Sequence, residues 1–171
     1  MFRSDLVVGA LVAFFGAAAL LGAVAAVRAL GRPAKVDAAA GAVLALVMLA
    51  MALGWAPLAT VPLMVTAGVV FLWFAVRLSI YRAVLTLFAG LVLFFAGRGG
   101  ASATDHPPHE VGTILVLVMC ALLALFAAAG WLLATFATPK GNAAVKPVPR
   151  LYGACQALMT AGLALSFYAI S

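Results

Sequence analysis

The side chains best suited to chemistry lie together in one polar stretch, residues 98–112. Within it, Asp105-His106-Pro107-Pro108-His109-Glu110 places two imidazoles and two carboxylates among six residues. Neutral imidazole binds zinc, copper or nickel, and carboxylates can complete the coordination shell. The two prolines stiffen the spacing between the histidines, which lowers the entropy cost of ordering a site. The motif is therefore a candidate site for copper or zinc; the other interpretation is a solvated loop whose Glu110 stabilises the start of the next helix.

Sulfur-containing side chains form a second candidate set, for a soft metal. Met48, Met51, Met119 and Cys120 are expected at mid-depth or in the outer halves of helices below the polar stretch, and Cu(I) prefers such ligands. The alternative is ordinary packing by flexible apolar side chains.

Cys155 is the only cysteine besides Cys120. Its expected depth differs from that of Cys120 by about 10 Å or more, beyond the roughly 7 Å Cα separation of a disulfide. Two free thiols are predicted.

The composition identifies the solvent in which these groups must be positioned. The chain has 171 residues, of which 68% are hydrophobic and 8% charged, and its mean hydropathy is +1.27. A soluble domain is nearer half apolar and a quarter charged. We therefore expect one integral membrane domain, residues 1–171, with an all-α fold. The net charge of +6 is spread over the ends of apolar runs, which indicates lipid headgroups and not nucleic acid as the partner.

Apolar runs of about 20 residues, enough to cross a hydrocarbon core of roughly 30 Å, predict a bundle of six helices. The expected spans are residues 6–30, 38–55, 61–78, 82–97, 113–138 and 151–170. Gly31 and Pro33 are expected to end the first helix, and Asp37 to cap the second. The run from 61 to 97 would make a single helix of about 55 Å, so it is divided between Arg77 and Arg82, whose side chains can reach the headgroups.

The distribution of basic residues predicts the orientation. Eight of the ten Lys and Arg residues flank the first, third and fifth connections: Arg28, Arg32, Lys35, Arg77, Arg82, Lys140, Lys146 and Arg150. The positive-inside rule assigns these connections to the cytoplasm. Both termini and the histidine-containing stretch are then outside. A multi-pass protein of the cell's inner, cytoplasmic membrane is predicted.

The lack of recognisable catalytic motifs favours a protein that is not an enzyme. The sequence has no HExxH motif, no glycine-rich phosphate loop and no ionisable side chain in the middle of a span, and Gln156 is the one strongly polar side chain there. Small residues recur at four-residue spacing in Gly9-Ala13-Ala17, Ala18-Gly22-Ala26 and Gly153-Ala157-Ala161, which lets helices approach closely within the bundle, against a partner membrane protein or against a second copy. An accessory or scaffold component of an envelope or respiratory assembly is the leading hypothesis. The alternatives are an extracytoplasmic metal-binding or metal-handling protein using Asp105 to Glu110, and a small-solute transporter.

Two stretches carry a resemblance to a family. Cys155-Gln156-Ala157-Leu158-Met159-Thr160-Ala161-Gly162-Leu163-Ala164 is similar to a recurring last-helix pattern, and Val47-Met48-Leu49-Ala50-Met51-Ala52-Leu53 to a helix-two pattern with paired methionines. The chain resembles an uncharacterised group of actinobacterial six-helix integral membrane proteins, a domain of unknown function. Members often carry a His/Met-rich outer loop where this chain has Asp105 to Glu110. The resemblance implies copper or another soft metal.

The metal hypothesis predicts a loss of bound metal when the two imidazoles are removed. His106 and His109 would be the direct ligands, with Asp105 and Glu110 as supporting oxygens, so a His106→Ala/His109→Ala variant should purify with less metal than the wild type. Affinity should fall below a pH of about 6.5, where protons compete for the imidazole nitrogens. Metal analysis and copper titration of the two purified proteins measure both effects. Equal metal content would remove the loop from any metal chemistry.

Overall fold

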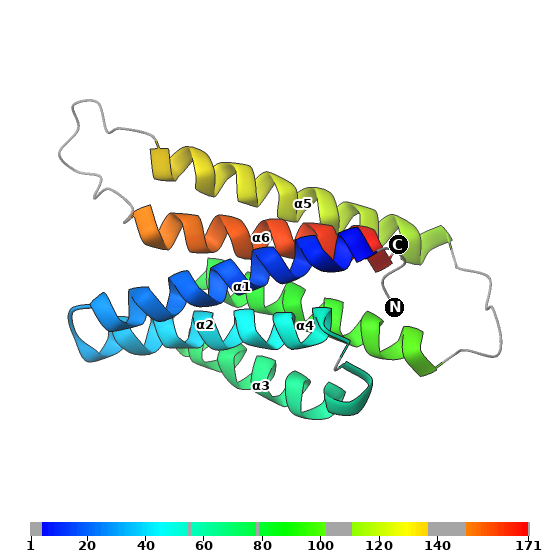
Figure 1. The fold of residues 1–171 in the computed structure, drawn as a ribbon, viewed down its shortest axis with the longest axis horizontal. Coiled ribbons are helices and arrows are strands. Elements are labelled where there is room, and N and C mark those ends of the chain that lie inside the picture. The colour runs from blue at the N-terminus through cyan, green and yellow to red at the C-terminus, as the bar shows by residue number, and fades with distance from the viewer. Residues whose placement is uncertain (1–4, 55, 78, 102–110, 137–149, 171) are drawn as a thin grey trace.

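The structure, a computed structural model, describes residues 5–54, 56–77, 79–101, 111–136 and 150–170. They form six helices, with no strand in the described ranges (Figure 1). The helices are α1 (Asp5–Arg28), α2 (Arg32–Ala52), α3 (Ala56–Val76), α4 (Ile80–Ala101), α5 (Val111–Phe136) and α6 (Arg150–Ile170). The predicted all-α six-helix bundle is confirmed.

Successive helices run in opposite directions and pack against their neighbours in the chain (Figure 1). Helix α5 packs against α6, and α1 joins α6 to α2. Helices α3 and α4 pair with each other, and α4 also contacts α6 and α2, which closes the bundle. The start of α1 and the end of α6 lie at one end. At the opposite end α1 finishes and α2, α4 and α6 begin; we call this the basic end.

The length and composition of the helices match those needed to cross a bilayer. Helices α1, α2, α6 and the Ile114–Phe136 portion of α5 are long and apolar enough to do so, and shorter apolar stretches occupy Val61–Val76 and Ile80–Phe95. In lipid the backbone N–H and C=O groups must be satisfied internally, which helices achieve. The four long apolar helices indicate a membrane protein whose apolar surface suits contact with a lipid bilayer. The orientation and the identity of the membrane stay predictions.

Two helices begin well before the residues that the sequence suggested, whereas the starts of the other four differ by one or two residues. Helix α2 starts at Arg32 instead of residue 38, because Pro33 occupies the first turn, where its missing N–H costs no hydrogen bond. Asp37 therefore lies inside the helix, and the prediction that it caps α2 is wrong: the N-cap is Gly31, with no side-chain cap. Helix α3 starts at Ala56 instead of residue 61 and contains Pro62, whose carbonyl accepts a hydrogen bond of 2.8 Å from the Thr66 hydroxyl.

The bundle is built around α6, in which 61% of the most apolar window is buried. Glycines let its neighbours approach. A Cβ atom at Gly162 would lie 2.7 Å from Cε1 of the fully buried Phe15 on α1. Gly153 is in contact with Thr135 of α5 in the same way. Two of the predicted small-residue stretches thus pack within the bundle, since Gly22 of α1 also lies against α2. Along Gly9-Ala13-Ala17, by contrast, the first two residues are exposed.

The tight contact at Gly162 predicts different effects for two glycine substitutions. Gly162→Ala should lower the free energy of unfolding by about 1–3 kcal/mol, because the new methyl group would overlap the ring of the fully buried Phe15. Gly16→Ala on α1, where no atom lies within 4 Å of the added Cβ, should be neutral or stabilising by up to about 1 kcal/mol. Thermal unfolding in detergent compares them. Equal melting temperatures would contradict this packing.

Candidate functional site

A carboxylate is held between helices near the basic end. Asp37 of α2 accepts a hydrogen bond of 2.9 Å from the indole Nε1 of Trp73 on α3, and its other oxygen lies 3.3 Å from Nη1 of Arg82 on α4. Nε of Arg77 lies 3.9 Å from the first oxygen. Both oxygens of the carboxylate are therefore occupied, and one side chain links three helices.

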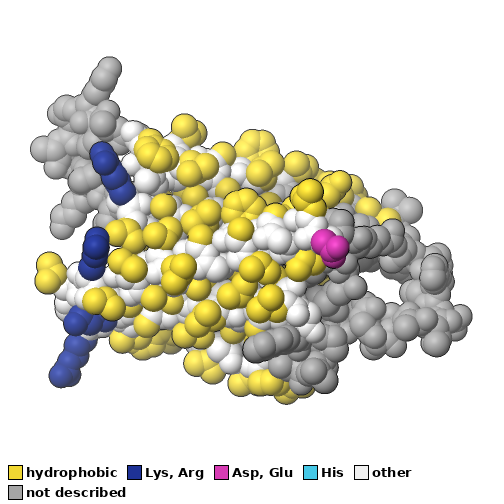
Figure 2. All heavy atoms as spheres, viewed as in Figure 1, with side chains coloured by type: hydrophobic (Ala, Val, Ile, Leu, Met, Phe, Trp, Pro, Cys, Tyr) yellow, Lys and Arg dark blue, Asp and Glu magenta, His cyan; other side chains and the backbone are white. Residues whose placement is uncertain are grey.

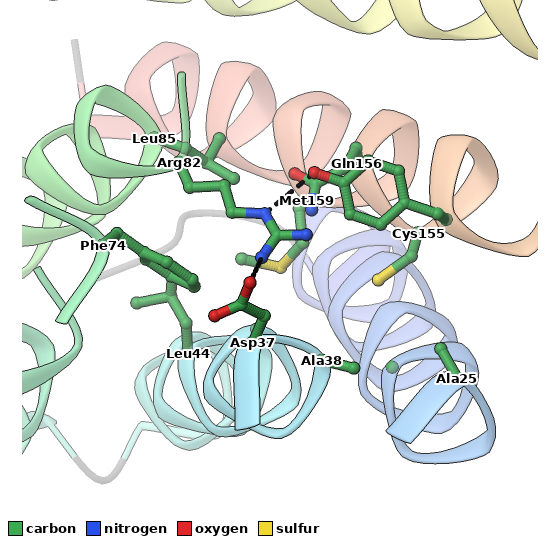
Figure 3. Close-up of a pocket in the computed structure, with 13 residues that line it drawn as sticks. Ala25, Asp37, Ala38, Leu44, Phe74, Arg82, Leu85, Cys155, Gln156 and Met159 are labelled. Atoms are coloured by element: carbon green, nitrogen blue, oxygen red, sulfur yellow. Dashed lines mark hydrogen bonds and ion pairs between the residues drawn. The ribbon is translucent and has the colours of Figure 1, made fainter. Parts of the chain in front are cut away.

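Arg82 extends the network to α6 (Figure 3). Its Nε donates a hydrogen bond of 2.8 Å to the Tyr152 hydroxyl, and its guanidinium lies 4.8 Å from the centre of the Tyr152 ring and 5.3 Å from that of Phe74. A cation over aromatic faces is stabilised more strongly when water is excluded. The side chain of Arg82 is only 16% exposed. The expectation that Arg82 extends to the headgroups is therefore wrong, because Asp37 and the aromatic rings attract it inward.

Aromatic contacts connect this network to the outermost helix. Trp131 of α5 packs edge-on against Tyr152, with ring centres 5.4 Å apart, and against Tyr81 of α4, with ring centres 5.0 Å apart. Such edge-to-face pairs contribute about 0.5–1.5 kcal/mol each beyond burial. The polar network and these rings together join α2, α3, α4, α5 and α6 near the basic end.

Two cavities that share several lining residues adjoin the network. The outer cavity, of about 520 Å³, lies between α1, α2, α4 and α6 at the basic end. It is lined by Ala25, Arg28, Ala29, Ala34, Asp37, Ala38, Arg82, Leu151 and Tyr152. The inner cavity, of about 30 Å³, shares Asp37, Arg82 and Tyr152 with it and reaches deeper into the bundle, to Cys155 and Gln156 (Figure 3). That volume is enough for a water-sized group.

Gln156 is the polar group at the bottom of this space. The residue is 7% exposed, and its Oε1 is buried without a hydrogen-bond partner in the described part of the protein. A buried carbonyl oxygen without a donor costs about 1–3 kcal/mol. A donor from a water molecule or a ligand in the inner cavity would remove that cost.

The charge at this end is strongly positive. Six described basic side chains lie here, and Figure 2 shows Lys and Arg gathered at one end of the molecule. They are Arg28, Arg32, Lys35, Arg77, Arg82 and Arg150. In the described ranges Asp37 is the single acid at this end, because Asp5 begins α1 at the other. A positive field therefore surrounds the mouth of the outer cavity.

The residues predicted to bind metal are not brought together in the described part of the structure. Asp105, His106, His109 and Glu110 lie outside the described residues, so metal binding by this loop stays a prediction. Within the ranges that the structure describes, no group of three or more His, Cys, Asp or Glu side chains is placed to hold a metal ion. The sulfur candidates lie on different helices: Met48 and Met51 are fully buried on α2, whereas Met119 is half exposed and Cys120 partly buried on α5.

The two cysteines are free thiols, as predicted. Cys155 has a structural contact of its own: its thiol donates a hydrogen bond of 3.4 Å to the backbone carbonyl of Ala18 on α1. It also lines the inner cavity beside Gln156.

The fold and the site define a helical membrane bundle with a largely apolar cavity, bordered by basic side chains, at one end. No protein-family model matches the chain, and no curated protein or solved structure matches it either. The likeness of residues 155–164 to an actinobacterial family stays a prediction from those residues.

Sequence reasoning missed the network of Asp37, Trp73, Arg82 and Tyr152. One signal was present. Asp37 is the only acid between residues 6 and 104, in an otherwise basic connection. An isolated carboxylate in an apolar chain must have a counter-charge, and Arg77 and Arg82 were the available residues at the same end. The choice of Arg82, and the contribution of Tyr152, required the helices to be placed.

The network predicts a coupling between Asp37 and Arg82. Asp37→Asn and Arg82→Gln should each lower the free energy of unfolding by about 1–3 kcal/mol, between the values for exposed and fully buried pairs, because the two side chains are 20% and 16% exposed. The double variant should lose less than the sum, since neither charge is then left alone. Arg77→Gln, whose side chain is 45% exposed, is the control and should cost about 0–1 kcal/mol. Additive losses in thermal or denaturant unfolding would rule the coupling out.

Proposed function

We propose that this chain is a non-catalytic membrane protein that serves as an accessory or scaffold component of an envelope or respiratory assembly in the cytoplasmic membrane. The observation that carries the proposal is the position of α5. It packs against α6 at the side of the bundle, and only 17% of the residues in its most apolar window are buried, the lowest fraction of the four long apolar helices. This helix offers a large apolar face to a neighbouring membrane protein.

The shape of the exposed face of α5 is suited to packing against another helix. Phe126, Leu133 and Phe136 are each about three quarters exposed, and Gly130 lies between the first two with no atom near its would-be Cβ. A small residue between bulky ones forms a notch into which a partner helix can pack, and such packing drives association in membranes.

The state of the charged groups also supports a non-catalytic role. The oxygens of Asp37 are bound to Arg82 and Trp73, and Arg82 also donates to Tyr152. General acid–base catalysis needs a group that is free to exchange a proton with a substrate. In this network the charged groups stabilise each other and hold the bundle.

The hydroxyl groups inside the helices give little support to a transport path. Those of Thr86, Thr135, Thr160 and Ser166 each donate to the backbone carbonyl four residues earlier in their own helix, at 2.6–2.8 Å. A hydroxyl that is bonded in this way has used its one hydrogen, so it cannot donate a hydrogen bond to a solute. The accessory role is therefore the hypothesis that we favour over the small-solute transporter.

The proposal predicts site-specific contact between α5 and another protein. A photo-crosslinking amino acid at Leu133 of α5 should capture one membrane protein in stoichiometric yield, and the same protein should copurify in mild detergent. Leu20 of α1 is the matched control, since the two side chains are 73% and 71% exposed, and should capture none. Mass spectrometry identifies the captured chain. A partner-free monomer, with no cross-link from either position, would contradict the accessory role, and capture of a second copy would replace it by a homo-oligomer.

A further inference from the structure

We propose that the outer cavity binds the headgroup of an anionic phospholipid whose polar end carries hydroxyl groups. The phosphate would lie near Arg28 at the basic end, and a headgroup hydroxyl would reach the inner cavity and Gln156. The inference is independent of the accessory role, because it concerns a different part of the surface.

Two helix N-termini border the outer cavity. Ala34 belongs to the first turn of α2, and Leu151 and Tyr152 to the first turn of α6; all three line the cavity. The first N–H groups of a helix lack partners within it and carry partial positive charge, which favours a phosphate. The N-cap of α2, Gly31, supplies no side-chain oxygen to those N–H groups. An anion in the cavity can therefore accept hydrogen bonds from the backbone.

Arg28 contributes a full positive charge at the same place. It lines the outer cavity and forms no ion pair within the described part of the chain. The nearby carboxylate, Asp37, is already bound to Arg82 and Trp73. Of the two arginines that line the cavity, Arg28 is thus the one whose charge is available to an incoming anion, while Arg82 is compensated.

Gln156 indicates the rest of the headgroup. Its buried Oε1 accepts no hydrogen bond in the described structure, and the residue lines the inner cavity together with Tyr152 and Arg82 (Figure 3). A hydrogen-bond donor on the ligand would satisfy this acceptor. A hydroxyl group of a glycerol or inositol headgroup fits both this requirement and the small inner volume of about 30 Å³.

The walls of the outer cavity favour a lipid over a free phosphate. Most of the lining is apolar, from Ala25, Ala29, Ala34, Ala38 and Leu151, and the volume of about 520 Å³ far exceeds that of a phosphate ion. The cavity lies at the ends of membrane-length helices, which is the level of the lipid headgroups when these helices span a bilayer. Basic cavities between helices at this depth are typical sites for anionic headgroups.

The test uses the purified full-length protein in detergent and measures thermal stability during titration with short-chain phosphatidylglycerol. We expect a saturable rise in melting temperature, since a ligand that binds only the folded state stabilises it. Phosphatidylcholine at equal concentration should give a much smaller rise. Equal rises with the two lipids, or an equal rise with inorganic phosphate, would overturn the assignment of an anionic lipid.

Matched variants locate the site. Arg28→Gln should weaken phosphatidylglycerol binding about tenfold, the effect of removing one charged hydrogen-bond donor. Arg32→Gln removes the same charge from the same end but from a residue that does not line the cavity, and it should change affinity by less than about twofold. Equal weakening by both substitutions would show attraction by the general positive field and would overturn the cavity site.

A second variant tests the inner cavity. The wild type should prefer phosphatidylglycerol to phosphatidylmethanol, an anionic lipid whose headgroup has no hydroxyl. Gln156→Leu should abolish that preference while it retains binding of both lipids through Arg28. An unchanged preference in a variant that still unfolds cooperatively would overturn the role of Gln156.

Discussion

A single negative charge among apolar helices constrains much of this bundle. The side chain of Asp37 is only 20% exposed, so the protein supplies most of the partners of its carboxylate. Arg82 provides the opposite charge from α4 and Trp73 a hydrogen bond from α3. Arg82 in turn is held by Tyr152 of α6, whose ring contacts Trp131 of α5. The relative positions of five helices at the basic end thus follow from the need to compensate one group.

Where no charged group joins the helices, close packing at small residues holds them together. Along α6, Gly162 admits the Phe15 ring of α1 and Gly153 admits Thr135 of α5. In a membrane no hydrophobic effect drives one helix against another, so close van der Waals contact must supply the attraction. Helix α6 combines the two modes, with the polar network near its start and tight packing along its length. This explains why it is the most buried of the long apolar helices.

The sequence predicted the number of helices because run length and bilayer thickness determine it. The predictions from the sequence that proved wrong have identifiable causes. Pro33 was interpreted as a helix terminator, whereas it serves in the first turn of α2, and this misplaced Asp37 at a helix cap. Arg82 was expected at the headgroups, because a local pattern cannot show that Asp37 and Tyr152 converge on it from other helices. The cavities could not be predicted at all, since they arise from helices distant in the chain. The free thiols were predicted because helical rise alone separates them.

The order of the residues in the Asp37 network has a consequence for biogenesis. Asp37 is synthesised with α2, whereas its counter-ion Arg82 follows in α4 and Tyr152 only in the last helix. A chain that enters the membrane from its N-terminus therefore offers Asp37 only Trp73 and the more distant Arg77 until α4 supplies Arg82. A chain that stops before α4 lacks the closest counter-charge of Asp37, and only a chain that includes α6 contains the whole network.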